Sequence, residues 1–206
     1  FANSITNKDI ADMWIHESFT NYSESLFVEY YYGKEAGFEY VRGTRKGIDN
    51  DKPIIGHYDV NSEGSSDMYP KGGNMLHTLR QIVNNDEKWR EILRGLNSTF
   101  YHQTVTTKQI EDYLSNATGV NLTAFFNQYL RDTRIPTLEY FFKKGFINFR
   151  WTNCVSGFDM PVKVTLNGAE QVLAPKTEWK NIATKTENQK LDVNRNFYVA
   201  SFNITE

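Results

Sequence analysis

The sequence is poor in the features that would assign it to a disulfide-rich or membrane class. Cys154 is its single cysteine, so no disulfide bond can form within the chain. No apolar run approaches the roughly 18 to 20 residues that a membrane-spanning helix needs. The chain has 206 residues and is therefore expected to bury a core of its own, as one large domain or two smaller ones.

Neither sign of charge dominates the sequence. It has 23 basic and 25 acidic residues, for a formal net charge of -2, so it lacks the field that would attract nucleic acid or an anionic membrane surface. The aromatic share of 15% suits a cleft that packs on a substrate, and it equally suits an ordinary core. The residues do not fix a compartment. A periplasmic or extracellular location is slightly favoured over a cytoplasmic one.

The residues from Asp12 onward predict a long amphipathic helix that continues to Tyr32 and ends at Gly33. A solvated face is the ordinary explanation for a polar stripe on such a helix. The stripe here has two carboxylates and two small polar groups at helical spacing. Its four members are Glu17, Thr20, Asn21 and Glu24.

The start of the chain resembles a family of zinc peptidases. Residues 1–6 read F-A-N-S-I-T, and residues 12–24 contain D-x-W-I-x-E-x-F-x-x-Y-x-E. These are similar to F-G-N-x-x-T and D-x-W-L-N-E-G-F-A-x-Y-x-E of the aminopeptidase N family of gluzincins. In that family H-E-x-x-H and a later glutamate hold the zinc. The resemblance implies that Glu17 is the third zinc ligand. Glu24 lies further along the same face of the helix, and its position there leads to the separate hypothesis that it supports the zinc ligands.

Three residues depart from the family pattern. Ala2 and Ser18 stand where the family has glycines, and His16 stands where it has asparagine. His16 points about 100° away from Glu17 on a helix, so it is expected to pack rather than to bind metal. None of the three changes the carboxylate of Glu17, and they bear instead on specificity near the metal.

The H-E-x-x-H segment itself is not in the chain. The family has eighteen residues between the second histidine and the ligand glutamate, whereas here sixteen residues precede Glu17. The second histidine is therefore expected three residues ahead of Phe1, in a larger enzyme. A catalytic zinc needs three protein ligands, so this chain alone is expected neither to hold zinc tightly nor to cleave peptides. Self-association is expected, through apolar surface that the missing part would cover.

A second motif surrounds Tyr69. Pro70 suits a first helical turn, and the apolar stripe after it places Tyr69 at or just before a helix N-terminus. On local sequence alone, Tyr69 is a capping residue. The pattern Y-x-K-G-x-x-x-L-x-x-L-R, however, resembles the family segment that contains the catalytic tyrosine. The resemblance implies that the Tyr69 hydroxyl donates a hydrogen bond to the oxyanion formed during peptide hydrolysis.

The remaining residues predict two domains, which make the fold class a mixture of α and β. Residues 1–135 are interpreted as the mostly helical C-terminal part of a thermolysin-like catalytic domain, because the resemblance continues to about Leu138. Residues 136–206 contain short alternating runs and a strong hairpin signal at Asn167-Gly168. They predict a small β-sandwich, a module that the family also has after its catalytic domain.

Two functions remain open at this point. The leading hypothesis is a fragment of a zinc aminopeptidase, which hydrolyses N-terminal residues from peptide substrates by metal-activated water. The alternative is a non-catalytic binding module, made of helices and a β-sandwich and derived from a peptidase. The first predicts that Glu17 and Tyr69 open onto one cleft. The second predicts that they lie in separate cores.

Overall fold

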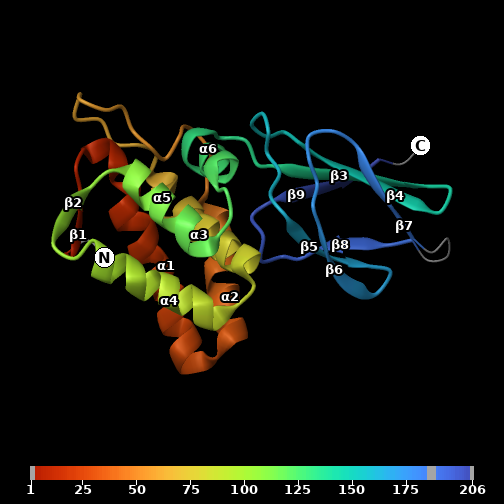
Figure 1. Cartoon of the computed structure of the whole chain (residues 1–206), viewed down its shortest axis with the longest axis horizontal. Helices are drawn as coiled ribbons and strands as arrows, with labels where there is room; N and C mark the ends of the chain where they lie inside the picture. The colour runs from red at the N-terminus through yellow and green to blue at the C-terminus, as the bar shows by residue number, and fades with distance from the viewer. Residues whose placement is uncertain (1–2, 185–188, 205–206) are drawn as a thin grey trace. The chain divides into compact units, whose positions relative to one another are not determined.

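The fold was analysed in a computed structural model that describes residues 3–184 and 189–204. The chain divides into two compact units, Phe1–Thr133 and Arg134–Glu206. The first unit is mainly helical and the second consists of strands (Figure 1). The predicted fold class, helices followed by a small β-sandwich, is confirmed. Among the described residues, no helix combines the length and the apolar character needed to cross a bilayer.

The long helix α1 spans Trp14–Tyr32 and ends at Gly33, whose φ of 92° favours glycine. A 3-10 turn, η1, precedes it at Ile10–Asp12, so α1 begins two residues later than predicted. Asp12 does not cap the helix. Its buried carboxylate instead accepts hydrogen bonds from Thr107 Oγ1 at 2.5 Å and from the Tyr58 hydroxyl at 2.6 Å. These contacts hold the start of α1 against two distant segments.

Helix α3 packs closely on α1 because two glycines face it. A Cβ on Gly72 would lie 1.9 Å from Ser18 Oγ, and a Cβ on Gly73 would lie 2.5 Å from Asn21 Oδ1. Only a residue without a side chain fits at such a distance. α3, at Pro70–Val83, is consequently buried along most of its length.

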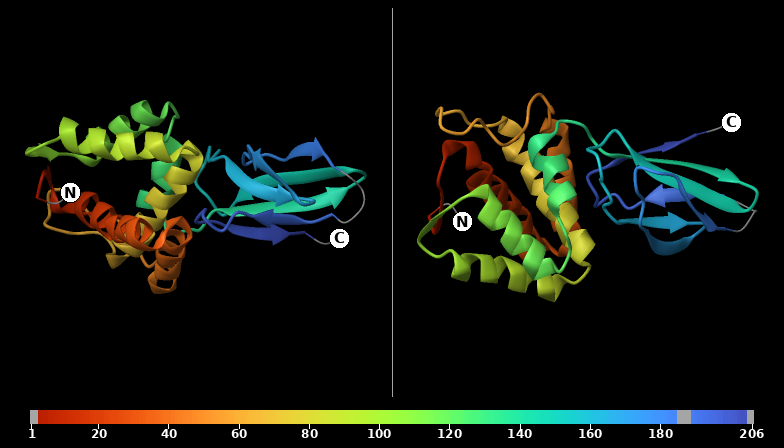
Figure 2. Two further views of the ribbon diagram at one scale, coloured as in Figure 1. Left: turned by 90° about the horizontal axis from the view of Figure 1, so that it is seen from below. Right: turned by 45° about the horizontal axis from the view of Figure 1, so that its top comes forward.

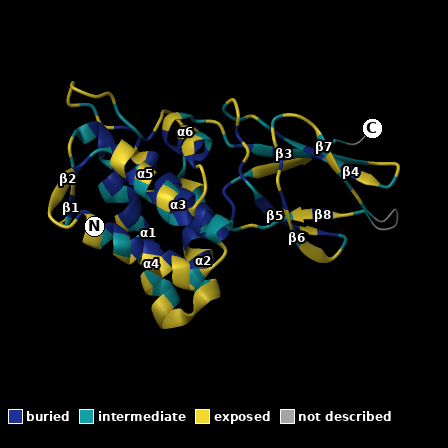
Figure 3. Cartoon of the chain, viewed as in Figure 1, coloured by how far each residue is buried: buried dark blue, intermediate teal, exposed yellow. Residues whose placement is uncertain are grey.

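Four further α-helices, two 3-10 turns and a small sheet complete the described part of the first unit. A capping box of Thr106 and Gln109 starts α5, and Gly119 ends it with a φ of 77°. The turn between α1 and α2 remains exposed (Figure 3). The other elements are α2 at Lys34–Gly43, η2 at Thr44–Gly47, η3 at Ser66–Met68, α4 at Asp86–Thr99, α5 at Thr107–Thr118, α6 at Thr123–Arg131, and the parallel pair β1 at Ile5–Asn7 and β2 at Gln103–Val105.

The second unit has a four-stranded sheet of order β7-β4-β3-β9 and a three-stranded sheet of order β6-β5-β8, seen from two directions in Figure 2. Asn167 and Gly168 form the tight turn between β5 and β6, with φ values of 50° and 83°. Buried Trp151 donates its indole N–H to the Met160 carbonyl at 2.9 Å. The strands are β3 at Thr137–Lys143, β4 at Phe146–Thr152, β5 at Val162–Leu166, β6 at Ala169–Leu173, β7 at Lys180–Ala183, β8 at Leu191–Val193 and β9 at Ala200–Asn203.

Candidate functional site

Glu17 lies in the first turn of α1 and is half-buried. The residues on either side of it differ in role. Ser18 faces the interior, whereas His16 turns its Nε2 toward the backbone N–H of Asn7, which donates to it at 3.1 Å. His16 is thus engaged by the β1 segment. The backbone N–H groups of His16 and Glu17 both donate to the Met13 carbonyl, at 2.9 and 3.1 Å, which fixes the first turn of the helix.

Tyr69 lies where η3 meets α3, so it stands just before a helix N-terminus. Its backbone N–H donates to the Ser66 carbonyl at 3.2 Å, and its own carbonyl accepts from the Gly73 N–H at 2.9 Å. The side chain is 44% exposed. The backbone of Tyr69 is therefore held by helical hydrogen bonds, while its phenol reaches toward solvent.

The structure brings Glu17 and Tyr69 together. The pKa of Tyr69 is raised above its usual value, first by partial burial and then by the charge of Glu17 and a hydrogen bond to its carboxylate, with a smaller effect from the charge of Glu63. A phenol with a raised pKa stays protonated at neutral pH and remains a hydrogen-bond donor. The two side chains thus share one solvent-accessible place and do not lie in separate cores.

Glu24 lies further along α1 and is exposed. Its carboxylate accepts a hydrogen bond from the Tyr40 hydroxyl at 2.8 Å and a long one from Asn21 Nδ2 at 3.5 Å. Tyr40 belongs to α2, so Glu24 connects α1 to α2. Its support of a zinc ligand stays a prediction.

The donor atoms present determine how well these residues fit zinc. The described residues contain no group of three or more His, Cys, Asp or Glu side chains placed to hold a metal ion. Glu17 offers a carboxylate oxygen of a kind that zinc accepts, in an accessible position. The described residues thus fit zinc only in part, because they offer this one carboxylate where a catalytic site needs three protein ligands.

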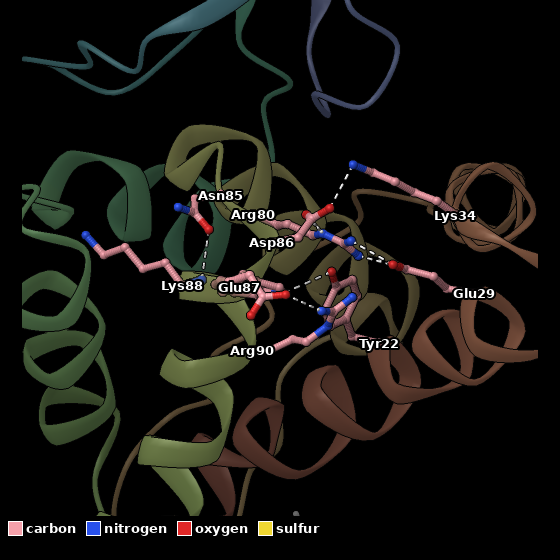
Figure 4. A network of polar contacts seen from close by, with 10 residues as sticks. Tyr22, Glu29, Lys34, Arg80, Asn85, Asp86, Glu87, Lys88 and Arg90 are labelled. Carbon is pink, nitrogen blue, oxygen red and sulfur yellow. Dashed lines mark hydrogen bonds and ion pairs between the residues drawn. The ribbon is translucent and has the colours of Figure 1, made fainter.

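A network of charged groups joins the same helices toward their other ends, away from Glu17 and Tyr69 (Figure 4). Arg80 of α3 binds Glu29 of α1 and also donates from Nε to Asp86 of α4 at 2.9 Å. Lys34 of α2 binds the other oxygen of Asp86 at 2.7 Å. The network therefore fixes the arrangement of four helices, including the two that position Glu17 and Tyr69.

Sequence reasoning missed the role of Asp12. Its partners, Thr107 and Tyr58, lie 95 and 46 residues away, so no local pattern signals them. Trp14 joins the same cluster by donating its indole N–H to Thr107 Oγ1 at 2.7 Å. The cluster anchors the N-terminal end of α1, one turn before Glu17.

Two comparisons relate the chain to known proteins. A family model described as the Peptidase family M1 domain matches residues 1–129. A crystal structure of Legionella pneumophila aminopeptidase A in complex with aspartic acid is similar in fold, with a TM-score of 0.74 and 13% sequence identity. That match covers 98% of this chain and 25% of the Legionella chain. The chain thus spans about a quarter of the length of that aminopeptidase.

Proposed function

The chain belongs to peptidase family M1, and on this premise we propose that it forms the C-terminal part of the catalytic region of a zinc aminopeptidase. The substrate would be a peptide with a free N-terminus, and the reaction would be hydrolysis of its first peptide bond. The observation that best supports this proposal is the hydrogen-bonded pair of Glu17 and Tyr69 at an accessible position within the matched residues.

In this proposal, Glu17 holds zinc together with ligands that are not among the described residues. Zinc, when bound, would lower the pKa of a water molecule and polarise the scissile carbonyl. Glu17 suits this task because it is half-buried and fixed in the first turn of a long helix. Packing of the neighbouring residues on α3 keeps its backbone in place.

Tyr69 would act on the substrate directly. When water adds to the scissile carbonyl, the carbonyl oxygen gains negative charge and accepts stronger hydrogen bonds. A phenol, whose ordinary pKa is about 10, is protonated at neutral pH, and the raised pKa of Tyr69 acts in the same direction, so Tyr69 can donate to that oxygen. One such donor contributes about 3 to 4 kcal/mol to the stability of the transition state.

The test uses the full-length protein that contains this chain. The purified protein is incubated with zinc and with two forms of one peptide, one with a free N-terminus and one acetylated there. Mass spectrometry is expected to detect release of the first residue from the free form alone. Cleavage of both forms, or of neither, would reject an aminopeptidase.

The variant Glu17→Gln tests the proposed ligand. It keeps the size of the side chain but removes its charge, so zinc affinity is expected to fall by at least about 100-fold. Glu87→Gln is the control, because Glu87 is an exposed residue of α4 that forms a surface pair with Arg90. Equal zinc affinity in the Glu17→Gln variant and the control would remove Glu17 from the site.

A further inference from the structure

We propose that Ser18 is a positioning residue, which sets where the Tyr69 phenol lies relative to Glu17. The inference rests on the proposed function, because it assigns Ser18 a part in the same reaction. Ser18 follows Glu17 in α1, and its hydroxyl donates a 2.7 Å hydrogen bond to the carbonyl of Met68, the residue before Tyr69. One buried hydrogen bond thus joins the residue after Glu17 to the residue before Tyr69.

The surroundings of Ser18 leave it little freedom. Its side chain is fully buried, and it fits against the backbone of α3 at Gly72. A Cβ on Gly72 would lie 1.9 Å from Ser18 Oγ and 2.5 Å from Ser18 Cβ. The serine therefore occupies space that a glycine leaves open, and its hydroxyl is held in place for Met68. Because the atoms in such a contact are closely packed, a small displacement of Ser18 is transmitted to both α1 and α3.

The segment before Tyr69 is also held from its other side. Asp67 is buried, and its carboxylate accepts the backbone N–H groups of Asp49 at 2.9 Å and Asn50 at 2.6 Å. Met68 is buried as well. Asp67 thus ties this turn to the loop after α2, whereas Ser18 ties it to α1. Of these two, the Ser18 contact is the one made by a neighbour of Glu17.

Tyr69 depends on this backbone support because the residue is 44% exposed, so packing around its ring is incomplete. The direction of its backbone therefore helps to set where the phenol lies. A donor displaced by about 1 Å can lose a large part of its effect on a transition state, up to about 100-fold. Loss of the Ser18 hydrogen bond should therefore slow the chemical step, in which Tyr69 donates to the oxyanion, more than it weakens substrate binding.

The test compares wild-type full-length protein with the Ser18→Ala variant. We expect kcat to fall about tenfold, with KM and zinc affinity each within twofold of wild type. Amide hydrogen exchange should accelerate in the peptide that contains Met68 and Tyr69. Unchanged kcat would overturn the proposal, and so would a loss of zinc affinity as large as the loss of kcat.

Ser25→Ala is the matched control. Ser25 is buried on the same helix, but its hydroxyl donates to the Tyr22 carbonyl at 2.7 Å, within α1. The Ser25→Ala variant is expected to keep wild-type kcat and wild-type exchange around Tyr69. A similar loss of kcat in both serine variants would indicate a general loss of helix stability and would overturn a specific role for Ser18.

A double-variant cycle distinguishes positioning from stability. In a Tyr69→Phe background, Ser18→Ala should lower kcat by less than twofold, because the donor that it positions is already gone. A further tenfold loss would overturn the proposal. Where Ser18→Ala does not fold, Ser18→Cys replaces it in the cycle with the same expectation of non-additivity.

The outcome also separates this inference from the proposed function. If the wild-type protein releases no residue from peptides, the aminopeptidase proposal fails. The exchange measurement still reports on Ser18 in that case. Faster exchange at Met68 and Tyr69 in the Ser18→Ala variant would support the hold on the turn, and unchanged exchange would overturn it.

Discussion

The Arg80 guanidinium binds the Glu29 carboxylate through two parallel hydrogen bonds, of 2.5 and 2.9 Å, across the contact between α3 and α1. The side chains are 4% and 15% exposed, so both charges are largely removed from water. The paired, forked geometry compensates for that loss of solvation. The same two helices position Tyr69 and Glu17, so the ion pair supports the candidate site from a distance.

Arg80→Met should lower the free energy of unfolding by about 3 kcal/mol, because it leaves Glu29 and Asp86 without their shared partner. Urea denaturation followed by circular dichroism at the helical band measures the change. Arg90→Met is the control, since its 3.2 Å pair with Glu87 is exposed and should contribute less than about 1 kcal/mol. Equal losses in the two variants would contradict a structural role for the buried network.

The pH dependence of stability should show the contribution of Asp86. Burial alone would raise the pKa of Asp86, but hydrogen bonds and charges from Arg80 and Lys34 outweigh burial and hold the pKa at about 2. The usual value of 3.8 applies to the unfolded chain. Because the folded-state pKa is lowered, the stabilising contribution is present above about pH 4 and is lost as the pH falls toward 2.

The variant Asp86→Asn isolates this effect, because it cannot titrate. The difference in free energy of unfolding between wild type and Asp86→Asn should be constant above about pH 5. It should shrink by about 1 to 2 kcal/mol between pH 5 and pH 2. Urea denaturation at a series of pH values gives the difference, and a difference that does not change over this range would count against the lowered pKa.

Tyr69→Phe should lower kcat about 100-fold in the full-length protein, with little change in KM. The variant removes a hydroxyl that is proposed to donate mainly in the transition state. Steady-state kinetics on a peptide substrate measure both constants. Tyr101→Phe is the control, because Tyr101 is a 60% exposed residue that stacks on His102. An unchanged kcat in Tyr69→Phe would remove Tyr69 from the reaction.

Glu24→Gln should lower the zinc affinity of the full-length protein about tenfold, if Glu24 supports the zinc ligands as proposed. Tyr40→Phe is the matched control, since it removes the 2.8 Å hydrogen bond to Glu24 and leaves the carboxylate charge in place. Competition with a chelator of known affinity measures both variants. Wild-type affinity in Glu24→Gln would limit Glu24 to its link with α2.

Local signals in the sequence were sufficient for much of the secondary structure. The turn at Asn167-Gly168 forms as predicted, because its backbone angles depend on the two residues themselves. The capping box at Thr106 is local in the same sense, since its hydrogen bonds join residues three positions apart. The start of α3 after Tyr69 follows from Pro70 in the same way. Such features need no information about distant parts of the chain.

Distant pairings could not be predicted in this way. β1 and β2 pair in parallel although α1 to α4 lie between them in the chain, and neither segment was predicted to be a strand. Each is three residues long, too short to show a period. Their pairing is a consequence of how the helices bring the two segments together.

The sequence by itself determined where α1 ends and where α3 begins, and its motifs singled out Glu17 and Tyr69 as a candidate ligand and a candidate donor. Only the tertiary structure decided that these two side chains meet, and that Ser18 joins their backbones through Met68, 50 residues away. The physical reason is the distance along the chain over which each interaction acts. Caps and turns act over a few residues, whereas this meeting depends on two glycines of α3 that admit α1 at close approach.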